Sequence, residues 1–190
     1  MQADMNQWYK DTKETTKLRG KLTFERIKTS NDWPKLKCKA AAVRHLLRYA
    51  KKLASDNNSG NTHDQRRLAC CTILQRFYDI CDNNERWLPQ DELNELAEGA
   101  RTFLGIYANL ARESLIKKER AWKLIAKFHL YVHLCEVQAK VFGNPRFFWT
   151  YADEDLQRVM KGVALGCHPL NLAPMVLYKW MLAKFDSDVS

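Results

Sequence analysis

Apolar side chains recur at steps of three and four residues along most of this chain, and this spacing constrains the fold more than any other feature. Over residues 35–54 the repeating positions share one side of a helix: Leu36, Ala40, Val43, Leu47, Ala50 and Ala54. The same period runs through 68–81 and 93–115. Only seven Gly and five Pro are present, too few for a turn-rich sandwich or barrel. The sequence therefore predicts an all-α fold, a single bundle of about six helices.

Local start signals place the ends of several predicted helices. The first helix is expected to begin at 31–34, with Asp32 as its cap, because Pro34 is tolerated in a first turn. Thr62 followed by Gln65 has the spacing of a capping box, and Pro89 is expected to open a third helix longer than twenty residues. Residues 121–139 are apolar on most sides, which predicts a central helix. A last helix is predicted over 172–185.

Charge is distributed unevenly. Residues 1–60 contain fourteen Lys and Arg against six Asp and Glu, whereas the whole chain has a net charge of +9. Residues 1–30 have few apolar side chains, so we expect a basic, partly disordered arm. The helical domain is then predicted over 31–185 and a polar tail over 186–190. A surplus of cations near one end favours an anionic partner such as nucleic acid.

The apolar runs and the cysteines limit where in the cell this protein is expected. No apolar run reaches the roughly 20 residues that span a bilayer, and the first thirteen residues are polar, which argues against a signal peptide or a membrane partner. The six cysteines form no CxxC pair, so we expect reduced, largely buried thiols rather than a zinc site. These features predict an intracellular protein, cytoplasmic or nuclear.

The first predicted helix carries a row of cations on the side away from its apolar residues: Lys37, Arg44, Arg48 and Lys51. Such a row contacts the phosphate backbone of nucleic acid without reading its sequence. A solvated helix face explains the same pattern equally well. The nucleic-acid interpretation is favoured slightly because the basic arm precedes this helix.

Two histidines form the pattern most typical of a metal site. His129 and His133 are four residues apart, so both imidazoles of a helix could reach one ion. No local motif supplies a third ligand, and two hydrogen-bonded histidines in a core or cleft are the alternative. The residues alone therefore predict no cofactor.

An aromatic run at 146–151 precedes an acidic cluster, Asp153, Glu154 and Asp155. The run is expected to form a strand or a buried loop, or to offer Phe147, Phe148, Trp149 and Tyr151 to a protein partner. Acidic residues are typical of a helix start, where they complement the exposed N–H groups. The alternative is that one carboxylate helps to hold a divalent cation.

The segments LKCKAAAVRHLLRYAKKLA, KFHLYVHLCE and FFWTYADEDLQRVMKG follow one another within residues 33–165. This order resembles the helical C-terminal region of CACTA-type (En/Spm-like) DNA transposases. The chain is also similar to predicted proteins of algae and dinoflagellates, which imply no function. The transposase resemblance implies that Glu154 is the last metal-binding carboxylate and that Mg²⁺ is the cofactor. No ribonuclease-H-like strands precede the helices and two further carboxylates lack counterparts, so catalysis by this chain alone is in doubt.

Three functions follow from these patterns. The first is a non-catalytic, nucleic-acid-associated helical module related to a mobile-element protein. The second is a helical bundle for protein–protein interaction, with the aromatic run as its partner surface. The third is a fragment of a metal-dependent nuclease or transposase that uses His129, His133 and Glu154. No motif in the sequence decides whether the chain is an enzyme.

Overall fold

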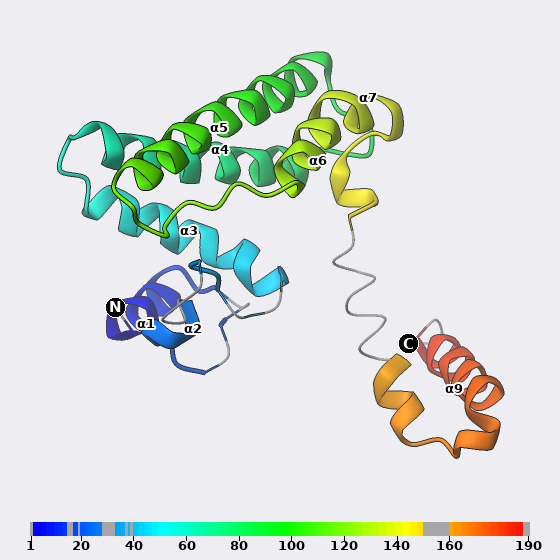
Figure 1. Cartoon of the computed structure of the whole chain (residues 1–190). Coiled ribbons are helices and arrows are strands. Elements are labelled where there is room, and N and C mark those ends of the chain that lie inside the picture. The colour runs from blue at the N-terminus through cyan, green and yellow to red at the C-terminus, as the bar shows by residue number, and fades with distance from the viewer. Residues whose placement is uncertain are drawn as a thin grey trace. The chain divides into compact units, whose positions relative to one another are not determined.

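The computed structural model describes residues 2–14, 17–18, 20–27, 33–36, 38, 40–149 and 160–187. Every regular element in these residues is helical, which confirms the predicted all-α class (Figure 1). The chain divides into two compact units, residues 1–148 and 149–190. The predicted division at 30/31 and 185/186 does not match these units.

The first unit contains α1 (Gln2–Asp11), α2 (Phe24–Ile27), α3 (Ala40–Asp56), α4 (Thr62–Asn83), α5 (Gln90–Ile116), α6 (Lys127–His133), the π-helical turn η1 (Leu134–Gln138), α7 (Ala139–Phe142) and the 3₁₀ turn η2 (Pro145–Phe147). The second contains helical residues 160–165, the 3₁₀ turn η3 (Pro169–Asn171) and α9 (Leu172–Ser187). The predicted last helix over 172–185 is thus confirmed. No helix in the described parts of the chain is both long and apolar enough to span a bilayer.

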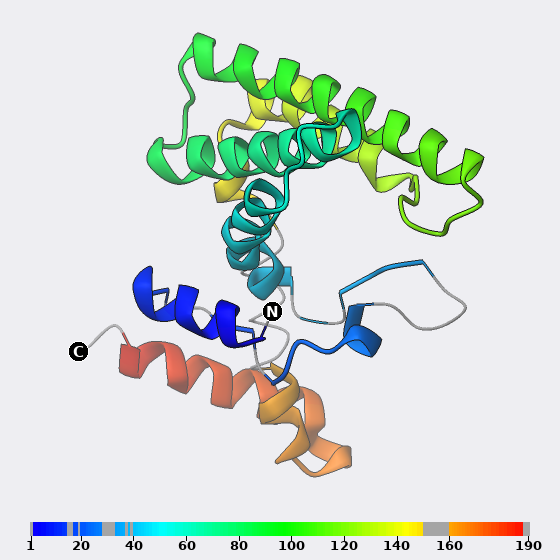
Figure 2. The ribbon, with the colours of Figure 1, turned by 90° about the vertical axis from the view of Figure 1, so that its left-hand side faces the viewer.

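Helix α4 is the central element of the first unit. It lies between α3 and α5 in two perpendicular views (Figures 1 and 2) and packs against both. Buried side chains therefore occur on more than one side of it, including Cys70, Phe77 and Ile80. The prediction that residues 121–139 form the central helix is wrong, because α4 takes that position.

The predicted ends of α4 and α5 agree closely with the structure. Helix α4 begins at Thr62, but its cap is Asn61, whose side chain accepts a hydrogen bond from the Asp64 N–H at 2.8 Å. The Gln65 side chain donates to the Gly60 carbonyl, so the expected Thr62 capping box is replaced by a cap one residue earlier. Helix α5 follows Pro89 and extends for 27 residues, which confirms a helix of more than twenty residues.

Residues 2–11 form helix α1, although the sequence predicted a partly disordered arm for 1–30. Met5, Trp8 and Tyr9 are buried in a cluster with Leu46 and Tyr49 of α3. The Tyr49 hydroxyl also donates to Asp4 at 2.7 Å. The arm prediction missed this helix because three apolar anchors in a polar segment suffice when a neighbouring helix supplies the remaining surface.

Helix α3 begins later than predicted. Residues 33–36 are not helical, and the Lys35 N–H donates to the Ile27 carbonyl at 2.7 Å. Leu36 packs against the cluster around Trp8 instead of forming a first turn. The helix begins at Ala40, and the expected cap Asp32 lies outside the described residues.

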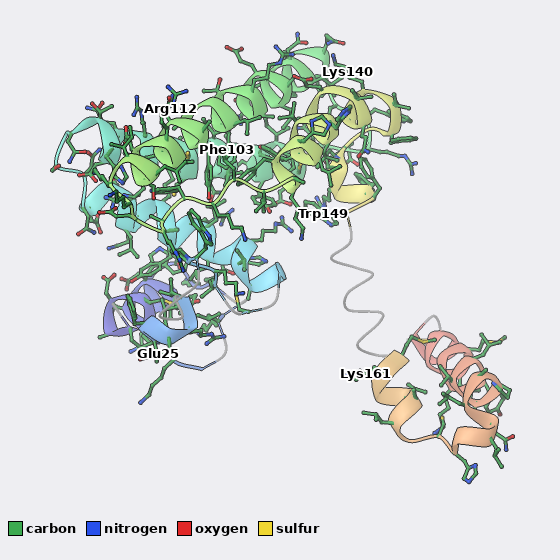
Figure 3. The ribbon with its side chains drawn as sticks, viewed as in Figure 1. Glu25, Phe103, Arg112, Lys140, Trp149 and Lys161 are labelled. Atoms are coloured by element: carbon green, nitrogen blue, oxygen red, sulfur yellow. The ribbon has the colours of Figure 1, made fainter. Side chains whose placement is uncertain are left out.

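Aromatic contacts attach the α5–α6 connection and α6 to α5. The Tyr107 ring lies 5.4 Å from Trp122 and 4.5 Å from Phe128, and Phe103 lies 5.8 Å from Tyr131, measured between ring centroids. Phe103 of α5 (labelled in Figure 3) is 4% exposed. Because these rings fix residues 122–131, only one side of α6, η1 and α7 faces the core. Cys135 and Ala139 continue that buried side.

The second unit is formed by residues 160–165, η3 and α9. Its helix α9 has apolar residues on most sides, and those described as exposed include Leu172, Leu177, Tyr178 and Leu182. Among the described residues of this unit, the large apolar side chains are therefore mostly exposed.

Candidate functional site

The predicted cationic row of α3 does not lie open to water at Arg44. The Arg44 guanidinium donates to both carboxylate oxygens of Asp82 on α4, and it also lies 5.1 Å from the centre of the Tyr78 ring. Only 18% of the Arg44 side chain is exposed. The expectation of a water-facing row is therefore wrong at this position, because the face that carries Arg44 packs against α4.

The other members of the row are placed differently from one another. Arg48 is 59% exposed and its guanidinium lies 3.8 Å from Asp79 of α4. Lys51 is half-buried, and Lys37 lies outside the described residues. The α3 face thus forms a seam of ion pairs with α4 in which two arginines face two aspartates. A seam of this kind offers less free positive charge to a phosphate backbone than the sequence suggested.

His129 and His133 lie side by side on the exposed side of α6, with ring centroids 4.6 Å apart. Both residues are exposed, so they do not form the hydrogen-bonded pair in a core that was one alternative to a metal site. Within the described residues, no group of three His, Cys, Asp or Glu side chains is placed to hold a metal ion. Glu154 and its acidic neighbours fall in the part of the chain that is not described. Among the described residues, the structure therefore offers only His129 and His133 as ligands for the predicted metal site.

The cysteines are free thiols, as predicted, and three of the six are buried. Burial raises the pKa of Cys70, Cys81 and Cys135 to about 12 in each case. These thiols therefore stay protonated at neutral pH, and a buried protonated thiol is a poor nucleophile.

The side of α6, η1 and α7 that faces away from α5 exposes a row of apolar side chains. Leu130 is 64% exposed, Val137 47% and Val141 59%. Each follows the last by one or two helical turns, so they share one side of the segment. The sequence predicted that further helices would cover this side, because 121–139 is apolar almost all round. Nothing within the described residues of the first unit covers it.

In its described residues, 146–149, the aromatic run starts within η2 and forms neither a strand nor a buried loop. Phe147 and Phe148 are exposed, and the Phe148 ring lies 6.0 Å from that of Phe142. Together with Arg86 and Gln138, these rings line a shallow cleft of about 400 Å³. Trp149 is half-buried, and Tyr151 lies outside the described residues.

A buried asparagine holds this turn against the end of α4. The Asn144 side-chain amide donates to the carbonyls of Cys81, Asn84 and Glu85, at 2.9, 3.0 and 3.2 Å. Its backbone N–H donates to the Arg86 carbonyl at 2.7 Å. The sequence identified Gly143-Asn144-Pro145 only as a chain break. Sequence alone could not show the partners of Asn144, which lie about sixty residues earlier.

The same turn brings the backbone of Gly143 close to Arg86 and Trp87. Gly143 has a φ of +85°, and a Cβ added there would lie 2.2 Å from the Arg86 carbonyl oxygen and 3.2 Å from the Trp87 ring. Glycine is therefore required for this close approach. Trp87 itself is 65% exposed. We define the α6–α7 apolar surface as Trp87, Leu130, Val137, Val141, Phe142, Phe147 and Phe148.

Exposed cations concentrate in the connection between α5 and α6. Residues 117–127 contain five Lys and Arg and one acidic residue, Glu119, and all six charged side chains are exposed. This segment has no distinct signal in the sequence, because its charges are interspersed with the apolar residues that predict a helix.

Comparison with known proteins finds no matching family model, no matching curated protein and no matching solved structure. The resemblance to CACTA-type transposases therefore stays a prediction.

Proposed function

We propose that this chain is a protein-interaction module that binds a partner through the α6–α7 apolar surface. The observation that carries the proposal is the exposure of four aromatic and three aliphatic side chains on neighbouring turns of one unit. Contiguous exposed apolar surface of this kind is typical of protein-binding sites. The cleft among Phe142, Phe147 and Phe148 provides a place for one apolar anchor of the partner.

The charges around the surface favour an acidic partner. Lys127, Lys140, Arg146 and Arg86 are exposed at its margins. Cations at the rim attract a partner of opposite charge and speed its association, while the apolar centre supplies most of the affinity. An amphipathic helix with acidic flanks has this chemistry, and it would lie along α6 and α7.

Site-specific photo-crosslinking tests the proposal. A photoreactive phenylalanine analogue at position 148 is expected to yield a discrete crosslinked species in extracts of the source cells. The same analogue at Asn94, exposed on α5, is the matched control. The Val141→Asp variant should abolish the species at 148 while leaving the circular-dichroism spectrum unchanged. Equal products from positions 148 and 94, or none from 148, would contradict the proposal.

One observation favours nucleic-acid association as a second candidate function. In this case the α5–α6 connection, and not α3, would contact the phosphates. Five exposed cations within eleven residues form a denser positive segment than the ion-paired α3 row. Each phosphate contact releases counterions, so such binding weakens steeply with salt.

Filter binding across a salt series tests this second candidate. Replacement of Lys117, Lys118 and Arg120 by Gln should reduce the slope of log affinity against log salt by roughly three for duplex DNA. The matched control replaces Arg48 and Lys51 of α3 by Gln and should leave the slope nearly unchanged. A larger change of slope in the α3 variant than in the 117/118/120 variant would place the contact on α3. If the wild-type chain shows no salt-dependent binding, this candidate is excluded.

A further inference from the structure

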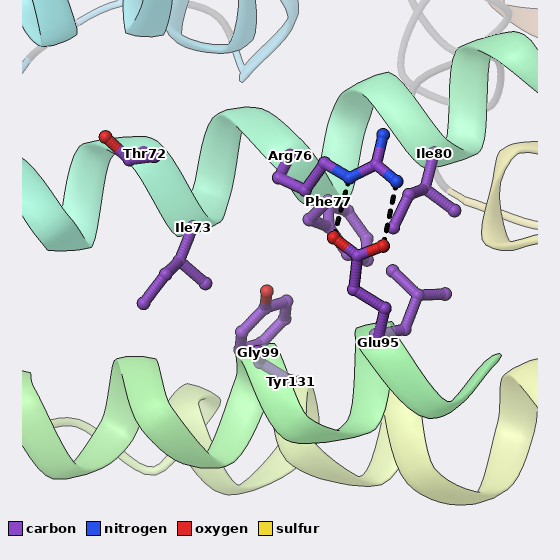
Figure 4. A pocket seen from close by; sticks show the side chains of 9 residues that line it. Thr72, Ile73, Arg76, Phe77, Ile80, Glu95, Gly99 and Tyr131 are labelled. Atoms are coloured by element: carbon purple, nitrogen blue, oxygen red, sulfur yellow. Dashed lines mark hydrogen bonds and ion pairs between the residues drawn. The ribbon is translucent and has the colours of Figure 1, made fainter. Parts of the chain in front are cut away.

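A cavity opens between α4 and α5, away from the α6–α7 apolar surface. Its volume is about 200 Å³. Figure 4 shows the side chains that line it, which come from α4, α5 and α6. The apolar walls are formed by Ile73, Phe77, Ile80, Leu96 and the Tyr131 ring.

The walls are firmly held. Phe77, Ile80 and Leu96 are 7%, 1% and 3% exposed, so each is fixed by the surrounding core. The Phe77 ring lies 5.4 Å from that of Tyr131, which closes the inner end. The apolar walls are therefore held by packed side chains and do not depend on a mobile segment, and the cavity is open on the side of Arg76 and Glu95, whose side chains are half-exposed.

An ion pair spans the cavity at one side. The Arg76 guanidinium of α4 donates to both carboxylate oxygens of Glu95 on α5, at 2.7 and 2.8 Å (Figure 4). The hydrogen bond from Arg76 is the main reason that the pKa of Glu95 lies below its ordinary value. Because the two charges satisfy one another, they offer no free charge to a ligand. The charged groups of this cavity therefore select against an ionic occupant.

A glycine on α5 leaves the space empty. A Cβ added at Gly99 would lie 3.5 Å from a methyl group of Ile73, so any larger side chain there would enter the cavity. Glycine inside a helix is about 1 kcal/mol less favourable than alanine. The chain thus carries a helix-weakening residue at the position where a side chain would fill this space.

Size and polarity define the class of occupant. An apolar cavity of about 150 Å³ stays dry and takes up benzene, because water there lacks hydrogen-bond partners. We propose that this cavity binds a small, uncharged aromatic molecule of one or two fused rings, of which indole is representative. The Tyr131 hydroxyl, which points toward α4 (Figure 4), is the uncharged polar group among the buried and half-buried side chains of the lining. The ligand therefore needs no more than one hydrogen-bonding group.

Fluorine NMR with 5-fluoroindole tests the proposal on the full chain. We expect saturable broadening of the ligand signal and shifts of the Ile73 and Ile80 methyl resonances, while the exposed Ile116 stays unchanged. The absence of saturable binding would overturn the proposal. So would binding that shifts Ile116 but neither Ile73 nor Ile80. These readouts are independent of the α6–α7 apolar surface.

Two alanine variants of α5 provide a matched comparison. Gly105 is exposed on the same helix, and a Cβ added there meets nothing within 4 Å. Gly105→Ala should therefore bind 5-fluoroindole as the wild type does, Gly99→Ala more weakly, and Gly99→Leu at least about tenfold more weakly. Equal affinity of Gly99→Ala and Gly105→Ala would overturn the proposal even if the leucine variant fails to fold.

Discussion

At the scale of single residues, Asn144 connects two distant parts of the first unit. Its side chain is completely buried and satisfies three carbonyls that follow or end α4. A buried carbonyl that loses its hydrogen-bond donor cannot bond to water instead, so the full free-energy cost of its desolvation remains. The position of η2, and with it the aromatic end of the α6–α7 apolar surface, therefore depends on one amide group.

The Asn144→Ala variant should lower the free energy of unfolding by about 3 kcal/mol, because it removes a buried amide and takes this donor from one buried and two partly buried carbonyls. Urea unfolding followed by circular dichroism measures this change. Asn94→Ala removes an exposed asparagine of α5 and should change the free energy by less than about 0.5 kcal/mol. A loss at Asn144 no larger than the loss at Asn94 would show that the amide does not hold the turn.

At the scale of helices, charged pairs determine which faces meet. Arg44 of α3 faces Asp82 of α4, and Arg76 of α4 faces Glu95 of α5. At the other end of α4, Glu113 of α5 accepts from His63 and Arg66. These pairs are partly exposed, so each adds little to stability. They lie where α3 and α5 contact α4.

The Glu113 contact predicts a dependence of stability on pH. The hydrogen bond from His63, and then the charge of Arg66, lower the pKa of Glu113 below its ordinary value. Because this pKa is lower in the folded state than in the unfolded state, the ionised carboxylate stabilises the fold at a pH above the ordinary pKa of glutamate. This stabilisation is lost as the pH falls through the pKa of the folded state. The free energy of unfolding should therefore decrease in acid, and less steeply in Glu113→Gln.

Urea unfolding between about pH 3 and pH 6 measures this slope, since the carboxylates titrate in that range. Glu98→Gln, at an exposed position of α5 outside this contact, serves as the control and should keep the wild-type slope. A Glu113→Gln slope equal to that of the wild type would mean that the contact does not form in solution.

At the scale of the whole molecule, the two units differ in how much core they contain. The first holds two apolar clusters, one around Trp8 and Tyr49 and one around Phe103. The second exposes most of the described apolar side chains of α9. Cooperative stability requires a buried core, so the first unit should carry it.

A chain ending at residue 148 should unfold cooperatively, with the same urea midpoint as the full chain. A chain ending at Ile116 lacks Trp122, Phe128 and Tyr131, which pack on α5, and should lose that cooperative transition. Circular dichroism during urea titration compares the full chain with the two shortened chains. A chain ending at 148 that is unfolded in buffer would show that residues 149–190 are needed for the fold.

The sequence by itself determined that the chain is helical and placed the starts of α4, α5 and α9 closely. These features depend on apolar periodicity and on residues such as Pro89, which act within one helix. It could not identify α1, because Met5, Trp8 and Tyr9 are stabilised by α3 and not by their neighbours in sequence.

Only the tertiary structure decided which side of each helix is covered. An apolar or charged row has the same pattern whether it faces water or another helix, and burial depends on elements far away in the sequence. That is why Arg44 and Arg48 of the cationic row face aspartates of α4, and why Leu130 and Val137, expected in the centre, are exposed.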